Sequence, residues 1–296
     1  MLPPLKEIDA GPAAARGEAL ADRFSLPLND RNWRGNPGDY AGTGVGSSLD
    51  FQDHRNYLPG DDPRHINWQA FARTGDYTLK LYREEVRPIV EIVMDVSGSM
   101  FADEDKAERS LELLYFSFFS AERAGASAKI FITKGPLWKP VEPHALLTHR
   151  WQELAGEMNE TESSTAPALG AIPFRQRSLR VLISDLLFTA APENSVQSLQ
   201  RNHGRAVLLC PYASSESNPG WNGNYEFIDS ENESRNDRRV DASLLKRYLE
   251  SYRRHFDRWK AAAMRAQIPF ARIESSARFA EAVRKEAVPS GAIQLS

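Results

Sequence analysis

The sequence contains a single cysteine, no hydrophobic run long enough to cross a membrane and no large excess of either charge. The lone Cys210 excludes an internal disulfide and any zinc site built from several cysteines. Its position at the end of the apolar run 206–210 predicts a buried, unreactive thiol. The 37 basic residues against 40 acidic residues give a net charge of −3, so bulk electrostatics give no reason to expect nucleic-acid binding.

Membrane insertion is not expected either. No apolar run approaches the roughly 20 residues that a bilayer-spanning helix requires. The first residues carry charges, among them Lys6, Glu7 and Asp9, where a signal peptide would have an apolar core. We therefore expect a cytoplasmic protein. Its 296 residues are enough for one large domain, or for a main domain with a smaller companion.

The most informative stretch of the chain covers residues 89–100. It begins behind Pro88 as a β-branched apolar run, which predicts a buried strand. It then turns into Asp95-Val96-Ser97-Gly98-Ser99, with one carboxylate and two hydroxyls at alternate positions. A strand that ends in this way and leads into a helix places three oxygen ligands at the carboxyl edge of a sheet, where open α/β sheets bind ligands.

Strands and helices alternate from this stretch to the C-terminus. The alternation predicts an α/β fold with a doubly wound, mostly parallel sheet and helices on both faces, plus a smaller N-terminal region with short strands. The further predicted strands cover residues 128–133, 179–187, 206–210 and 269–273. The predicted helices cover residues 104–124, 143–158, 193–201 and 277–286, together with a long helix that Asp241 caps.

The composition along the chain suggests its division into domains. We expect a loose segment over residues 1–28, which are rich in Ala, Gly, Pro and charge, and an N-terminal region over 29–86 that packs on the main domain. The main domain then covers residues 87–288. Within it, residues 213–240 are polar and contain two turn sequences, which predicts a hairpin insertion.

A metal site is one interpretation of the acidic strand ends. Asp95 and Asp185 each follow a buried strand, and a Ser/Thr-rich loop containing Thr165 lies between them in the sequence. In a doubly wound sheet these segments can meet, and with Ser97 and Ser99 they would offer only hard oxygen ligands, which suit one Mg²⁺ or Mn²⁺ ion. The other interpretation is a helix N-cap and turn, where Asp and Ser are also favoured, and the spacing leaves both open.

A second group of polar residues lies within residues 49–75, upstream of the central strand. It could be a site, or an ion-paired elbow anchored by a tryptophan, because such clusters perturb pKa values without doing chemistry. The residues concerned are Asp61, Asp62, Arg64, His65, Trp68 and Arg73.

Two resemblances follow from these motifs. Asp95-Val96-Ser97-Gly98-Ser99, a later loop threonine and a later strand-end aspartate resemble the metal-ion-dependent adhesion site of von Willebrand factor A-type domains. Upstream, Asp50-Phe51, the run from Tyr57 to Trp68, Ala72-Arg73 and Glu84-Glu85 resemble the bacterial domain-of-unknown-function-58 family. The resemblance covers roughly residues 30–286 and implies a von Willebrand A-like domain behind a short N-terminal region.

The family resemblance implies a function and a set of ligands. Members commonly accompany MoxR-type AAA+ ATPases, which implies a non-enzymatic adaptor in chaperone-like or complex-assembly work, with a metal that recruits the ATPase or a client through an acidic side chain. Asp95, Ser97 and Ser99 would bind the ion directly, Thr165 from the loop, and Asp185 directly or through water. The chain departs from the family where Asn67 replaces the usual acid, and where no glycine pair precedes Thr165.

Two other functions stay open. A Mg²⁺-dependent phosphohydrolase or phosphotransferase could use Asp95 as its nucleophile, but Ser97 stands where such an enzyme needs an acid to protonate the leaving group. Lys129 and Lys134 could neutralise a phosphate, but neither is clearly placed to do so. The chain could also be a structural scaffold with a vestigial metal site.

Overall fold

The computed structural model describes residues 5–28, 49–59, 61–84, 87–158, 166–230 and 234–296. The chain divides into two compact units. The larger unit takes in Met1–Leu28 and Pro88–Ser296, and the smaller unit takes in Asn29–Arg87. No helix among the described residues is long and apolar enough to span a membrane.

The larger unit is built on a six-stranded sheet in the order β11-β8-β7-β4-β5-β6. Five strands are parallel and β6 is an antiparallel edge strand, which confirms the predicted mixed α/β fold with a mostly parallel sheet. The strands are β4 (Ile89–Asp95), β5 (Ser127–Lys134), β6 (Leu137–Val141), β7 (Leu179–Ile183), β8 (Arg205–Tyr212) and β11 (Phe270–Glu274). The central strands β4 and β7 are almost entirely buried, as strands covered on both faces must be.

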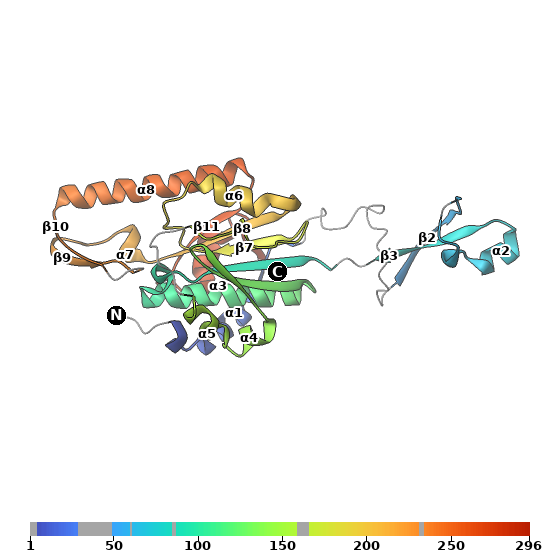
Figure 1. Cartoon of the computed structure of the whole chain (residues 1–296), viewed down its shortest axis with the longest axis horizontal. Helices are drawn as coiled ribbons and strands as arrows, with labels where there is room; N and C mark the ends of the chain where they lie inside the picture. The colour runs from blue at the N-terminus through green and yellow to red at the C-terminus, as the bar shows by residue number, and fades with distance from the viewer. Residues whose placement is uncertain (1–4, 29–48, 60, 85–86, 159–165, 231–233) are drawn as a thin grey trace. The chain divides into compact units, whose positions relative to one another are not determined.

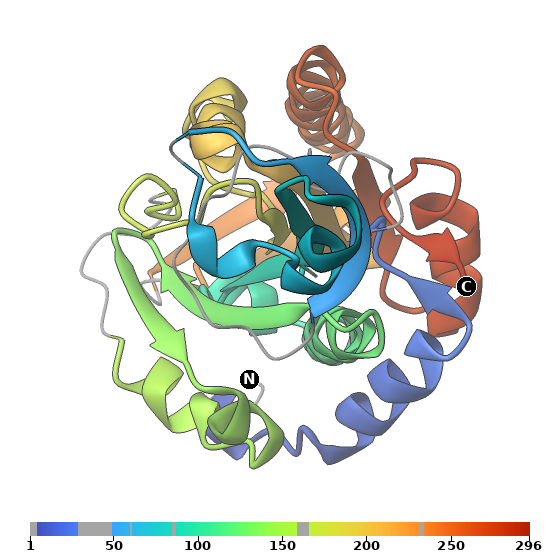
Figure 2. The ribbon, with the colours of Figure 1, turned by 90° about the vertical axis from the view of Figure 1, so that its right-hand side faces the viewer.

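Helices cover both faces of the sheet (Figure 1). Helix α3 (Glu104–Arg123) and helix α1 (Gly11–Ala21) lie on one side, and α6 (Pro192–Gln200) and α8 (Ala242–Arg265) lie on the other, as the second view also shows (Figure 2). Shorter elements complete the unit: η1 (Leu5–Glu7), β1 (Phe24–Ser25), η4 (Gly98–Phe101), α4 (Pro143–Leu147), α5 (Trp151–Gly156), η5 (Arg201–His203), α7 (Ser214–Ser217), α9 (Phe279–Ala282), η6 (Val283–Ala287) and β12 (Gln294–Leu295).

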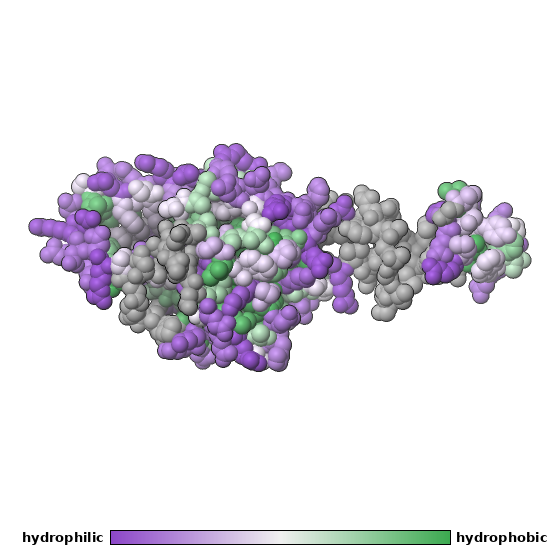
Figure 3. Space-filling view, in the orientation of Figure 1, coloured by the Kyte–Doolittle hydropathy of each residue, from purple (hydrophilic) through white to green (hydrophobic). Residues whose placement is uncertain are grey.

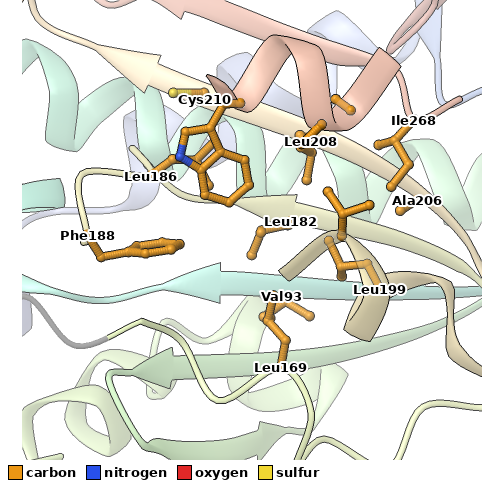
Figure 4. Close-up of a cluster of buried hydrophobic side chains, with 14 of the residues drawn as sticks. Val93, Leu169, Leu182, Leu186, Phe188, Leu199, Ala206, Leu208, Cys210 and Ile268 are labelled. Atoms are coloured by element: carbon orange, nitrogen blue, oxygen red, sulfur yellow. The ribbon is translucent and has the colours of Figure 1, made fainter. Parts of the chain in front are cut away.

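The hydrophobic core beneath α6 and α8 gathers side chains from adjacent strands. Figure 4 shows Val93 from β4, Leu182 from β7 and Leu208 from β8 within one cluster of buried residues. Trp259 from α8 is fully buried in the same cluster. Burying an aromatic side chain of this size contributes a few kcal/mol, on the order of 3, relative to exposure. The cluster therefore fixes α8 against the sheet through its aromatic face.

The polar insertion after β8 is a hairpin. Strands β9 (Gly223–Ile228) and β10 (Arg235–Val240) pair antiparallel within the 213–240 segment in which the sequence predicts a hairpin. Asp241 then accepts a hydrogen bond from the backbone of Leu244 (2.8 Å) and caps α8, as predicted.

The smaller unit contains a two-stranded antiparallel sheet and short helices. Its elements are β2 (Leu49–Asn56), the 3-10 helix η3 (Pro63–His65), α2 (Trp68–Thr74) and β3 (Thr78–Glu84). Short strands are what the sequence predicts for this region. The expectation that the region packs on the main domain stays a prediction.

Residues 5–28, the described part of the segment expected to be loose, form regular elements. Helix α1 belongs to the larger unit and packs along α3. A Cβ added at Gly17 would lie 2.7 Å from the backbone N of Phe116 and 2.9 Å from the backbone O of Glu112, so the two helices touch at a position that only glycine fits. Arg16 also forms ion pairs with Glu108 and Glu112 of α3. The small residues Ala13, Gly17 and Ala21 are buried and form a close-packed helix face.

We expect Gly17→Ala to destabilise the larger unit by about 1–3 kcal/mol, because a methyl group at this contact overpacks α1 against the α3 backbone. The matched control is Gly156→Ala at the end of α5, where the nearest atom to an added Cβ is 4.0 Å away. Thermal melts of both variants test this. A Gly17→Ala protein as stable as wild type would show that α1 does not pack closely on α3.

Candidate metal centre at the sheet edge

The sheet topology brings the two predicted strand-end acids to one place. The chain runs from β4 outward to β5 on one side, and from β7 outward to β8 on the other. Asp95 ends β4, and Asp185 follows β7 after Ser184. The two strands are adjacent and parallel, so both acids lie at the carboxyl edge, at the point where the strand order reverses. The charge of Asp185 is close enough to raise the pKa of Asp95.

Asp95 is held by short contacts inside the protein. Its Oδ1 accepts a hydrogen bond from the backbone N of Ser97 (3.0 Å), and its Oδ2 accepts one from Ser184 Oγ (2.7 Å). Its side chain is buried, with the residue 2% exposed. Burial raises the pKa of Asp95 to about 7, and the charge of Asp185 adds to the rise, while the hydrogen bonds from Ser184 and Ser97 oppose it. A negative charge at Asp95 is therefore costly without a cation beside it.

The two serines of the predicted motif lie together beside Asp95. Ser97 Oγ and Ser99 Oγ are 3.3 Å apart, and both residues are half-buried. Asp95 bonds the backbone of Ser97 two residues on, as in an Asx turn, so the turn interpretation of this motif is present in the structure. The hydroxyls are not used as helix caps: Asp103 caps α3, by accepting from the backbone N of Lys106. Hydroxyl oxygens of this kind are hard ligands of the type that Mg²⁺ and Mn²⁺ prefer.

Asp185 forms a buried ion pair with Lys106. Lys106, in the first turn of α3, is 0% exposed, and its Nζ lies 2.7 Å from Asp185 Oδ2 and 2.5 Å from Glu216 Oε1. The other Asp185 oxygen accepts from the backbone N of Leu187 (3.1 Å). Burial acts to lower the pKa of Lys106, but the charges and hydrogen bonds of Asp185 and Glu216 outweigh it, and the pKa is raised. Both carboxylate oxygens of Asp185 thus have protein donors.

Glu216 connects this cluster to the insertion and to α8. Its Oε2 accepts from the backbone N of Ala213, and its backbone O accepts from Tyr248 Oη of α8 (2.8 Å). Next to Asp185, the carbonyl of Leu186 is 2.7 Å from His255 Nε2, also on α8. Burial raises the pKa of Glu216, and the charge of Lys106 opposes the rise. The candidate site is therefore supported from β7, α3, α7 and α8 at once.

Sequence reasoning missed Lys106 and Glu216. The sequence does contain a signal for Lys106. A lysine in the first turn of a helix is disfavoured by the helix dipole, so an acidic partner that stabilises its charge is expected. It also shares a helix face with Ser110 and Leu113, which are both buried. Glu216 gives no such signal, because it lies in a polar stretch 110 residues further along the chain.

Other predicted features fall outside the site or outside the described residues. Thr165 is not among the described residues, so its proposed role as a ligand stays a prediction. Among the described residues, no group of three His, Cys, Asp or Glu side chains is arranged to hold a metal ion. Cys210 is buried as predicted, burial raises its pKa to about 12, and its Sγ lies 3.4 Å from the Asp185 carbonyl.

In the smaller unit, Asp61 and Asp62 have local structural contacts. Asp61 accepts two hydrogen bonds from Arg55 (2.7 and 2.8 Å) and one from the backbone of Leu58, so the Arg55 guanidinium lowers the pKa of Asp61. Asp62 caps η3 and pairs with Arg64. These contacts agree with the ion-paired elbow.

The tryptophan of the same segment does not anchor the elbow. Trp68 is 59% exposed, and its ring lies edge-on to Phe71 and Tyr77 on the surface of the smaller unit. Arg73 is exposed, and His65 is the last residue of η3. The segment therefore combines a structural turn with an exposed aromatic cluster.

Asp95→Asn should remove a pH-dependent penalty. Folding raises the pKa of Asp95 from roughly 3.9 to about 7, so the folded state binds the extra proton, and stability from this group is complete below pH 4 and is lost as the pH rises through 7. In chelator-containing buffer we expect the variant and wild type to differ by no more than about 1 kcal/mol at pH 4.5. At pH 8 the variant should be more stable by up to about 4 kcal/mol. A stability difference that does not change with pH would contradict this.

Lys106→Met should lower the free energy of unfolding by about 3–5 kcal/mol, because it leaves the buried Asp185 carboxylate and the half-buried Glu216 carboxylate without their cation. Adding Asp185→Asn should recover part of the loss. The control is Lys139→Met, which removes an exposed pair with Glu157 and should cost under about 1 kcal/mol. Urea melts measure all three. Equal losses for Lys106→Met and Lys139→Met would mean that the buried cluster is energetically unimportant.

Two solved structures show a distant likeness to the chain. One is BatB, a conserved hypothetical protein from Bacteroides thetaiotaomicron, with 10% identity and a TM-score of 0.32 over 69% of this chain and 98% of that chain. The other is an aerotolerance-related membrane protein from Bacteroides fragilis NCTC 9343, with 13% identity and a TM-score of 0.27 over 61% and 98%. Both TM-scores are too low to carry an argument. No curated protein matches the chain.

A protein-family model does match. It is that of the DUF58 proteins, described as proteins of unknown function, and the match covers residues 53–258. The matched stretch includes the Asp61–Trp68 segment, both strand-end aspartates, Lys106 and Glu216. It covers more than half of the chain. The chain therefore belongs to the DUF58 family of proteins of unknown function.

Proposed function

We propose that the chain is a metal-dependent protein-interaction module, and not an enzyme, that binds one Mg²⁺ or Mn²⁺ ion at the carboxyl edge of β4. The observation that carries the proposal is the group of hard oxygen donors at this edge: the Asp95 carboxylate with the adjacent hydroxyls of Ser97 and Ser99. Hard oxygens are the ligands that both ions prefer, and water completes their coordination.

The electrostatics of Asp95 support the fit. A buried carboxylate whose pKa is raised to about 7 is stabilised in its charged form by a divalent cation beside it. Asp185 fits less well as a direct ligand, because the Lys106 ammonium group already neutralises its charge. In this proposal Asp185 acts through water, and Thr165 completes the site from its loop.

The charge balance favours an acidic partner. Lys106 faces Asp185, so Asp95 is the carboxylate left to neutralise an ion. A bound ion supplies a positive centre with positions open to a further oxygen ligand. The serine and aspartate side chains would hold that ion, and the ion would offer an open position to an Asp or Glu side chain of another protein. Binding of this kind needs no bond to be broken in the partner.

The family resemblance suggests the wider role. A von Willebrand A-like domain with an adhesion-type metal site, working in the cytoplasm with a MoxR-type AAA+ ATPase, would recruit the ATPase or a client for chaperone-like or assembly work. The Asp-x-Ser-x-Ser run from Asp95 to Ser99 at the end of β4 supports this proposal.

The phosphohydrolase alternative fits the site less well. A nucleophilic aspartate must reach its phosphate, but Asp95 is buried and both of its oxygens accept hydrogen bonds from the protein. Lys106, which could have neutralised a phosphate, is enclosed between Asp185 and Glu216. Two hollows of about 500 and 480 Å³ in the described surface are lined by neither aspartate.

A metal titration tests the proposal. Adding Mg²⁺ or Mn²⁺ to chelator-treated wild type should raise its melting temperature, because an ion that binds only the folded state stabilises it by roughly 2.7 kcal/mol at a hundredfold excess over Kd. Asp95→Asn should lose this shift. The control is Asp241→Asn, which removes a carboxylate at the α8 cap but keeps a capping side chain. Equal shifts in wild type and Asp95→Asn would refute the metal assignment.

The same proteins separate binding from catalysis. We expect no turnover of p-nitrophenyl phosphate by the Mg²⁺-loaded wild type. Turnover that disappears in Asp95→Asn would establish the phosphohydrolase alternative instead. A metal shift in wild type without any turnover is the result that the interaction module predicts.

A further inference from the structure

Positive charge is concentrated on helix α8. Its 24 residues contain seven Lys and Arg but only two Asp and Glu, so the helix carries a charge of +5. The whole chain carries −3, and the rest of it therefore carries −8. All seven basic residues are exposed: Lys246, Arg247, Arg253, Arg254, Arg258, Lys260 and Arg265.

Four of the arginines form a line along the helix. Arg247, Arg254, Arg258 and Arg265 are separated by seven, four and seven residues. With 3.6 residues per turn these spacings place them within roughly 40° of one direction, over a length of about 27 Å. We call this line the arginine stripe.

The packing of α8 points the stripe away from the core. Tyr252, Phe256 and Trp259 are buried against the sheet, on the side of the helix opposite the stripe. Figure 3 shows hydrophilic residues along α8 at the top of the larger unit. The helix is held by its aromatic face, so the stripe can stay rigid while it binds a partner.

The protein itself does not neutralise the stripe. Among the described residues, Arg265 pairs with Glu193 (2.7 Å), but Arg247, Arg254 and Arg258 form no ion pair. Arg254 and Arg258 are four residues apart on one helix face, an arrangement in which like charges repel and destabilise the helix. A helix face that only contacts water gains nothing from such a concentration of positive charge. An external anionic partner would offset the repulsion.

The surroundings of the stripe distinguish between anionic partners. A membrane-surface helix needs a strip of exposed apolar residues, and on α8 Met264 is the one large hydrophobic residue that is strongly exposed. Binding to single-stranded nucleic acid usually uses exposed aromatic rings for stacking, but the α8 aromatics Tyr252, Phe256 and Trp259 face the core.

We propose that the arginine stripe of α8 is a docking surface for an acidic protein surface, such as a helix that carries a row of Asp and Glu. Guanidinium groups bind carboxylates through paired hydrogen bonds, and a row of them matches a row of carboxylates of similar length. The interaction depends on these charges and not on a metal ion, so it stands independently of the proposed metal site.

The test uses labelled poly-L-glutamate of about 20 residues as the acidic probe, a length that covers the stripe if helical. Fluorescence anisotropy with the full chain is measured in chelator, at low and high salt. Wild type should bind at low salt and weaken as the salt rises. Arg254→Glu/Arg258→Glu should weaken binding at least about tenfold, because like charges across an interface cost several kcal/mol.

A matched charge reversal supplies the control. Arg284→Glu/Lys285→Glu changes the net charge equally at two exposed residues outside α8, and should alter binding less than about twofold if the stripe is the site. Thermal melts establish that both variants fold. No binding by wild type, or equal losses in the two variants, would overturn the proposal. So would tighter stripe-dependent binding of a 20-nucleotide oligo-dT or of phosphatidylserine vesicles.

Discussion

The buried contact between Lys106 and the carboxylates of Asp185 and Glu216 is the constraint on which the sheet edge depends. Charges are removed from water there at a cost that only close pairing repays. The contact joins α3, the end of β7 and α7, three elements that the chain brings together from positions 106, 185 and 216. In the proposed metal site it leaves Asp95 as the carboxylate for the ion, because Asp185 already faces the Lys106 ammonium group.

The cluster also connects the insertion after β8 to the edge that carries Asp95 and Asp185. Glu216 lies in α7, at the start of the insertion, and its backbone O accepts from Tyr248 of α8. A movement of Lys106 would therefore shift Glu216, and through Tyr248 it would displace the first turns of α8. The candidate metal site and the arginine stripe are thus attached to one framework, although each rests on separate charges.

Much of the sheet could be predicted because its signals are local. The apolar runs at β4, β7 and β8 each predict a buried strand from their own residues. Because parallel strands end at the same edge of a sheet, Asp95 and Asp185 can be placed together before any contact is known. The predicted helix over 143–158 fails because the chain breaks at His149, which has a positive φ of 59° between α4 and α5. Strand β6 was missed because a proline interrupts its short run, as is typical of edge strands.

The Lys106 cluster could not be predicted in the same way. Its partners are 79 and 110 residues away, and pairing over such distances leaves no periodic trace in a single sequence. The 49–75 segment shows the converse. Asp61 and Asp62 pair with Arg55 and Arg64 within a few residues, so an ion-paired elbow could be considered from the sequence.

In the smaller unit, several large apolar side chains are exposed while few of the described ones are buried. Among its described side chains, Ile66, Asn67 and Leu79 are buried, whereas Leu58, Trp68 and Tyr77 are each about half exposed or more. The two apolar side chains among these buried residues, Ile66 and Leu79, contribute only a small buried apolar area. Local hydrogen bonds such as those of Asp61 must therefore hold the turn in place, and they do so without using the aromatic rings. The rings of Trp68, Phe71 and Tyr77 contact one another instead, with Phe71 and Tyr77 stacked, and this leaves much of Trp68 and Tyr77 on the surface.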